Sequence, residues 1–125
     1  RRVLFRSGRP VKNLIMDGRV VVGVGNIYAS EALFRAGIHP QRNAGSLGAA
    51  ACQRLTDEIK AVLARAIRRG GTTISDYRGS GNGGRFQQEL MVYGRAGEPC
   101  RTCDAPLQSL VMAGRNTFFC RQCQR

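Results

Sequence analysis

The sequence predicts a mainly α-helical domain followed by a small β-hairpin ribbon that cysteines hold together. Two observations support this fold class. The stretch 47–69 has apolar residues at helical spacing, which predicts a long helix with one buried face; these residues are Leu55, Ile59, Val62, Leu63, Ala66 and Ile67. The stretch 99–125 contains four of the five cysteines, arranged as two C-x-x-C pairs.

The helical domain is expected to span residues 10–94, after an aperiodic arm at residues 1–9. The segment "VKNLIMDG", residues 11–18, suits a short helix ended by its glycine. Asn26 is a good N-cap residue for a second helix, "IYASEALFRA", and Gly37 is a good residue to end that helix.

The long helix is expected to run from Leu47 to Arg69, with Ser46 as its cap and two glycines after its end. The following segment, "TTISDYRGSGNGGRFQQ", has four glycines in six residues and is typical of a loop. The boundary with the ribbon, residues 95–125, is expected between Gly94 and Pro99.

The cysteine spacing predicts a zinc ribbon. Each C-x-x-C pair directs two thiolates to one point, so two pairs supply four sulfur ligands to one tetrahedral Zn²⁺. Between the pairs, "LQSLVM" and "TFF" suit two strands, with "AGRN" as the turn. Four protein ligands leave no open position, so the metal is structural; the ligands are Cys100, Cys103, Cys120 and Cys123.

Two other interpretations of the cysteines stay open. Disulfides are one, although no secretory signal is visible and a fifth cysteine would be left over. A thiol redox centre is the other, although it usually requires a strand–helix context. Cys52 lies in the long helix, where we expect a buried and unreactive side chain.

The charge of the chain indicates a polyanionic partner. The 125 residues contain 20 Lys and Arg against 8 Asp and Glu, a formal charge of +12. All of these basic residues are arginine except Lys12 and Lys60, and arginine suits bidentate contacts to phosphate. Nucleic acid is therefore expected first and an anionic membrane surface second, while the plain alternative is charge that serves solubility.

The ends of the chain and its hydropathy give three further expectations. No apolar run approaches the roughly 20 residues that cross a bilayer. No signal peptide is visible, because "RRVLFRSGRP" has no apolar core. The first residue is Arg1 rather than Met, so the chain is expected to be a fragment or a processed product.

Motifs other than the cysteines point to binding rather than catalysis. "GVGNIY" does not match a dinucleotide fingerprint, because Tyr28 stands where a third glycine is needed. A helix that begins at Asn26 suits either a bound phosphate or a plain cap. His39 is expected to be a structural loop residue, and Arg115 to project from the hairpin tip, as a phosphate contact or a solvated turn residue. We find no catalytic centre in the residue pattern.

Four segments together resemble the bacterial formamidopyrimidine-DNA glycosylases: "VVGVGNIYASEALFRAGIHP", "GGTT", "FQQELMVYGRAGEPC" and "TFFCRQCQ". The resemblance runs from Pro10 to Arg125 and covers the second half of the family's chain. It implies a helix–two-turns–helix domain followed by a four-cysteine zinc finger. Enzymes of this family remove oxidised purines such as 8-oxoguanine and cut the strand at the abasic site, whereas the related endonuclease VIII branch prefers oxidised pyrimidines.

The resemblance also implies roles for individual residues. By position, Lys12 and Asn26 match residues that bind the phosphates flanking the lesion, and Arg115 matches the finger arginine that contacts the same backbone. The segment "SDYRGSGNGGRF" is similar to the loop that closes over the extruded base. Its candidate residues are Tyr77, Arg78, Gly79, Ser80, Gly81, Asn82, Gly83, Gly84 and Arg85.

The family's nucleophile is an N-terminal proline followed by an acidic segment, and position 1 here is Arg1. We therefore expect the DNA-binding C-terminal part of a base-excision-repair glycosylase/AP lyase, without its catalytic half and inactive alone. The implied partners are double-stranded DNA containing oxidised bases and that catalytic half. We expect a monomer that acts on the nucleoid in the bacterial cytoplasm and not on a membrane. The alternative is a stand-alone, non-enzymatic zinc-ribbon protein that binds nucleic acid.

Overall fold

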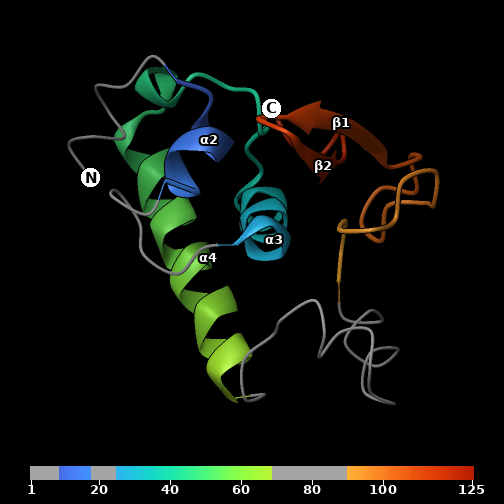
Figure 1. The fold of residues 1–125 in the computed structure, drawn as a ribbon, viewed down its shortest axis with the longest axis horizontal. Helices are drawn as coiled ribbons and strands as arrows, with labels where there is room; N and C mark the ends of the chain where they lie inside the picture. The colour runs from blue at the N-terminus through green and yellow to red at the C-terminus, as the bar shows by residue number, and fades with distance from the viewer. Residues whose placement is uncertain (1–8, 18–24, 69–89) are drawn as a thin grey trace.

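The computed structural model describes residues 9–17, 25–68 and 90–125. In chain order the elements are α2 (Val11–Ile15), α3 (Asn26–Ala36), the 3-10 helix η1 (Ala44–Ser46), α4 (Ala49–Arg68), β1 (Gln108–Met112) and β2 (Arg115–Phe119). Helix α3 lies between α4 and the β1–β2 hairpin (Figure 1). The predicted fold class, a helical domain followed by a small hairpin ribbon, is confirmed.

Helix α2 is shorter than the sequence suggests. It starts after Pro10, whose fixed φ angle suits a helix start, and it ends at Ile15, while Gly18 lies outside the described residues. The backbone N–H of Val11 donates to the carbonyl of Arg42 at 2.7 Å, which fixes the start of α2 against the loop between α3 and α4.

Helix α3 ends as predicted but does not begin as predicted. Gly37 ends it with a left-handed φ of 74°, a conformation that glycine adopts without strain. Asn26 is not the N-cap: Gly25 takes that position in an extended conformation, and no side chain caps the helix. Asn26 is the first helical residue, and its side chain is used in contacts with other elements.

Helix α4 begins at Ala49, so the prediction that Ser46 caps it was wrong. Ser46 belongs to η1, and its hydroxyl donates to the carbonyl of Asn43 at 2.7 Å. Leu47 has an extended backbone and is 3% exposed, so it lies in the core as part of the connection that precedes the helix. The predicted apolar face packs against α3 through buried Leu55, Ile59 and Val62.

Strands β1 and β2 pair antiparallel, with Ser109 opposite Phe118 and Met112 opposite Arg115. The turn between them is two residues long rather than the four predicted, since Arg115 and Asn116 already belong to β2. Ala113 and Gly114 have φ angles of 51° and 76°, as a tight hairpin turn requires.

Two apolar clusters form the interior. The larger one packs α2, α3 and α4 together and includes Cys52, which is 2% exposed as expected for a buried side chain. The smaller one lies in the ribbon around Val92, Leu107 and two of the cysteines, and it also contains Phe34 from α3. Because α3 contributes to both clusters, it connects the helical domain to the ribbon.

Among the helices in the described part of the chain, none is both long and apolar enough to cross a membrane.

Candidate metal centre and nucleic-acid interface

The four predicted cysteine ligands come together at one point of the ribbon. The Sγ atoms of Cys100, Cys103, Cys120 and Cys123 all lie within 4.8 Å of one another. Those of Cys103 and Cys120 are 3.4 Å apart, and those of Cys100 and Cys123 are 3.8 Å apart. A tetrahedral zinc ion with Zn–S bonds of about 2.3 Å places its sulfurs about 3.8 Å apart, so the cluster fits this ion.

The chemistry of the thiols also favours a bound cation. Burial opposes the ionisation of Cys100, but hydrogen bonds from the backbone N–H groups of Thr102 and Cys103 lower its pKa to about 7. Burial and the neighbouring sulfurs raise the pKa of Cys123. Four thiols at this distance cannot all ionise without a compensating charge, so proton release and metal binding are coupled.

The four cysteines are therefore the ligands of one structural zinc ion. All four ligand positions are filled by protein sulfurs, which leaves no position for a substrate or a reactive water. The four thiolates and the divalent ion carry about two net negative charges. Exposed arginines on the ribbon offset this charge; they are Arg101, Arg115, Arg121 and Arg125.

Lys12 and Asn26 are in direct contact, although they belong to different helices. The Lys12 side chain is 1% exposed, and its Nζ donates to Asn26 Oδ1 at 2.6 Å and to Thr117 Oγ1 at 2.6 Å. The amide nitrogen of Asn26 in turn donates to the backbone carbonyl of Asn116 at 2.9 Å. Helices α2 and α3 and strand β2 therefore meet at one polar cluster.

Arg115 belongs to the same region. It is exposed at the start of β2, next to the hairpin turn. Burial is the main cause that lowers the pKa of Lys12 to about 8, and the positive charge of Arg115 is the second. Both hydrogen-bond partners of Lys12 are uncharged, so no carboxylate among the described residues neutralises its ammonium group. We call Lys12, Asn26 and Arg115 the cationic cluster.

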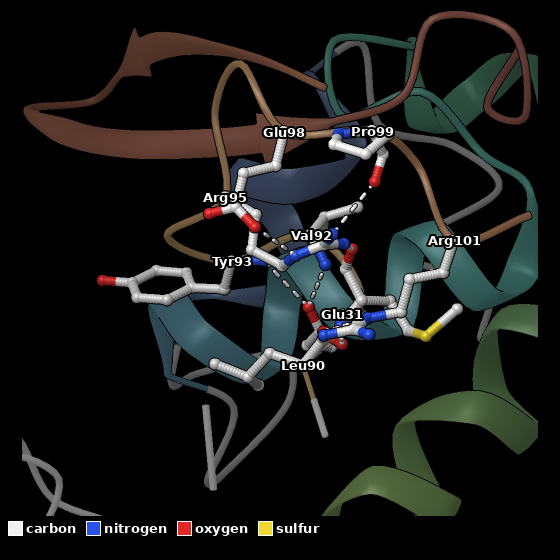
Figure 2. Close-up of polar contacts among 9 residues, drawn as sticks. Glu31, Leu90, Val92, Tyr93, Arg95, Glu98, Pro99 and Arg101 are labelled. Atoms are coloured by element: carbon white, nitrogen blue, oxygen red, sulfur yellow. Dashed lines mark hydrogen bonds and ion pairs between the residues drawn. The ribbon is translucent and has the colours of Figure 1, made fainter. Parts of the chain in front are cut away.

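A buried glutamate joins α3 to the segment that leads into the ribbon (Figure 2). Glu31 is 3% exposed, and its carboxylate accepts hydrogen bonds from the backbone N–H groups of Met91 at 2.8 Å, Val92 at 2.8 Å and Tyr93 at 3.0 Å. Three donors on one carboxylate compensate a charge that burial would otherwise make costly.

Arginines complete this junction from the ribbon side. The buried guanidinium of Arg95 donates to the carbonyls of Met91 at 2.6 Å and Pro99 at 2.9 Å, and Arg101 donates to the carbonyl of Leu90 at 3.1 Å (Figure 2). The expected domain boundary at residues 94–99 therefore lies in a closely hydrogen-bonded segment. The division into residues 1–9, 10–94 and 95–125 stays a prediction.

The C-terminal residues form a second junction with the helical domain. Gln124 is buried, and its side chain accepts from the N–H of Cys120 at 2.8 Å and donates to the carbonyl of Ile38 at 2.9 Å. His39 packs its ring 4.6 Å from that of Phe119, and its Nδ1 accepts from the N–H of Gln41 at 3.0 Å. These contacts agree with a structural role for His39.

Sequence reasoning missed Glu31, Asn116 and Thr117. Glu31 lies inside a helical segment with Arg35 four residues further on as an ordinary helical partner, so its local pattern gives no sign of the backbone donors at Met91, Val92 and Tyr93. The predicted loop residues Tyr77 to Arg85 lie outside the described residues, and their proposed contact with a lesion stays a prediction.

Fold and site together define a helical domain joined to a four-cysteine zinc finger, with a cationic cluster where the two meet. A family profile described as "Formamidopyrimidine-DNA glycosylase H2TH domain" matches residues 1–78, including the nine residues expected to form a separate arm. A second profile, described as "Zinc finger found in FPG and IleRS", matches residues 97–125. The chain belongs to the formamidopyrimidine-DNA glycosylase family.

Curated relatives match over nearly the whole chain. The formamidopyrimidine-DNA glycosylase of Alteromonas mediterranea is 58% identical over 117 residues, which are 93% of this chain and 44% of that protein. The enzyme of Escherichia coli K12 is 57% identical over 116 residues, or 92% of this chain and 43% of that protein. The chain thus spans less than half the length of the curated relatives it matches.

Solved structures show the same arrangement. The MutM (Fpg) protein of Thermus thermophilus superposes with a TM-score of 0.87 at 47% identity, over 98% of this chain and 47% of that one. The Lactococcus lactis Fpg, in a complex with DNA containing an abasic site, superposes with a TM-score of 0.88 at 38% identity, over 99% of this chain and 46% of that one.

Proposed function

We propose that the chain is the DNA-binding C-terminal part of a base-excision-repair DNA glycosylase/AP lyase, whose chemistry resides in a catalytic half outside these residues. The single observation that supports this best is the cationic cluster. Lys12 is buried, hydrogen-bonded only to neutral groups among the described residues, and close to a second cation. A DNA phosphate is an anion, and one of its oxygens would accept a hydrogen bond from Lys12 and neutralise this uncompensated charge.

The proposed partner is double-stranded DNA that contains oxidised purines. The solved relatives include MutM in a complex with DNA containing carbocyclic 8-oxo-G and the Lactococcus lactis Fpg in a complex with FAPY-dG DNA, which supports this class of lesion. The +12 charge supports a backbone-directed mode of binding. We also propose a monomer that acts on the nucleoid in the bacterial cytoplasm.

The test is the salt dependence of duplex binding by the zinc-loaded chain and its Arg115→Ala variant. Removing one phosphate contact should weaken binding with little sequence dependence and reduce the slope of log K against log salt by roughly one. Arg65→Ala on α4 is the matched control and should keep the slope. Equal affinities and slopes for the chain and Arg115→Ala, at equal zinc content, would exclude Arg115 as a phosphate contact.

A lesion-containing duplex gives the second arm of the test. If the proposed role in base-excision repair is right, a duplex with a stable abasic-site analogue should bind more tightly than the same duplex without it. Equal binding would favour the stand-alone nucleic-acid-binding protein. The gene upstream of Arg1 separates the two as well, because a proline directly after the initiator Met is expected for the glycosylase.

A further inference from the structure

Strand β2 supplies one member of the cationic cluster and contacts the other two, through three successive residues. Arg115 is itself a member, the carbonyl of Asn116 accepts from the Asn26 amide at 2.9 Å, and Thr117 Oγ1 accepts from Lys12 Nζ at 2.6 Å. This strand also leads directly into Cys120, so its position depends on the zinc ribbon.

Thr117 has the features of a residue that orients another group. It is 0% exposed, and its hydroxyl donates weakly to the carbonyl of Arg115 at 3.4 Å, which leaves the oxygen lone pairs free for Lys12. Serine or threonine is needed for this geometry, because valine has the same shape but no acceptor.

We propose that Thr117 is a positioning residue that holds the Lys12 ammonium in place and makes its position depend on the zinc ribbon. Lys12 has a long side chain, and its placement in one rotamer costs entropy unless fixed acceptors compensate. Asn26 supplies one acceptor from the helical domain and Thr117 supplies the other from the ribbon. The importance of this placement for DNA binding rests on the proposed function, whereas the contact itself does not.

The contact can be tested without DNA, because the chain has two lysines only, Lys12 and Lys60. With labelled lysine, the NMR titration of each side chain can be followed separately, and exposed Lys60 serves as the internal control. The Thr117→Val substitution removes an acceptor from the charged form, so the pKa of Lys12 should fall below its value in the unsubstituted chain, while that of Lys60 stays unchanged. Thr117→Ser should restore it.

The second readout is duplex affinity at equal zinc content. Thr117→Val should weaken binding about three- to tenfold, the range expected for the loss of one hydrogen bond, and Thr117→Ser should recover most of it. An unchanged Lys12 pKa in a zinc-loaded Thr117→Val protein would overturn the proposal. If the unsubstituted chain binds no duplex, the proposed function fails, while the titration still decides the role of Thr117.

A measurement on the unsubstituted chain covers the case in which Thr117→Val does not fold. The methyl group of Thr117 and the terminal methylene of Lys12 should show a nuclear Overhauser contact in the zinc-loaded protein. Its absence would overturn the proposal without any substitution.

Discussion

The carboxylate of Glu31 on α3 accepts a hydrogen bond from the backbone N–H of Val92 at 2.8 Å, across 61 positions of the sequence. Val92 is also a member of the apolar cluster in the ribbon, and it is fully buried. One acidic residue therefore holds the segment through which the chain enters the zinc finger, and it does so with main-chain donors, which any sequence at positions 91–93 other than proline would supply.

Replacing Glu31 by Gln should destabilise the zinc-loaded protein by about 1.5–3 kcal/mol, because a neutral amide accepts more weakly and turns an NH₂ group toward N–H donors. Urea unfolding measures the difference. Glu58→Gln on α4 is the matched control and should change the free energy of unfolding by about 0.5 kcal/mol or less. Equal effects of the two substitutions would show that the Glu31 contacts add nothing to stability.

Metal analysis should find one zinc ion per chain. Cys103→Ser should lower the affinity for zinc, because it replaces a thiolate by a hydroxyl in a closed site. Cys52→Ala should keep full zinc content, since Cys52 lies in the helical core. Disulfides among the four ligand cysteines in native protein, or well under one zinc per chain, would contradict the assignment.

Duplex binding should weaken as the pH rises through about 8. Burial, and then the charge of Arg115, lower the pKa of Lys12 to about 8, so the free protein loses this cation above that pH. A bound phosphate raises the pKa again, so affinity should fall from about pH 8 up to the higher pKa of the complex. Binding titrations from pH 6.5 to about 9.5 measure this loss.

The pH dependence of the free energy of unfolding has the opposite sign to that of DNA binding. The unfolded chain holds the Lys12 proton up to a pKa of about 10.4, so between about pH 8 and 10.4 the unfolded state binds more protons. The contribution of Lys12 to the free energy of unfolding therefore rises with pH in this window.

Lys12→Gln should lose most of the pH dependence of DNA binding, and Lys60→Gln should keep it. A pH-independent affinity in the unsubstituted chain would contradict the role of Lys12.

Local chemistry explains what the sequence alone could predict. The cysteine spacing predicts a metal site because each C-x-x-C pair is a self-contained turn, and the structure places all four sulfurs together. Gly37 ends α3 because a left-handed residue is required directly after the helix. The apolar spacing of α4 predicts its buried face because burial follows the helical period.

Contacts between distant segments explain what the sequence could not predict. Asn26 has the propensity of an N-cap, but its side chain bonds to Lys12 and to the carbonyl of Asn116, 90 positions away. Thr117 reaches Lys12 across 105 positions, and no local pattern indicates such a partner. The resemblance predicts DNA contacts for Lys12, Asn26 and Arg115, but it does not indicate that strand β2 contacts Lys12 and Asn26.

The chain by itself should not excise 8-oxoguanine. The lyase reaction requires an amine placed at the sugar carbon and carboxylates that handle protons. The side-chain amines available are Lys12, which is buried and hydrogen-bonded, and Lys60, which is exposed on α4. Placement of the reacting groups accounts for about 7–11 kcal/mol of such a barrier, so an unplaced amine is a poor catalyst.

A labelled duplex with one 8-oxoguanine, incubated with excess zinc-loaded chain and then with borohydride, measures both excision and covalent trapping. We expect salt-sensitive binding without strand cleavage and without an adduct, because the chain has the cationic cluster but no placed nucleophile among its described residues. The formamidopyrimidine-DNA glycosylase of Escherichia coli is the positive control. Cleavage or trapping at a rate near that of the control would show that these 125 residues contain a nucleophile, and Lys12→Gln and Lys60→Gln would then show whether it is one of the two lysines.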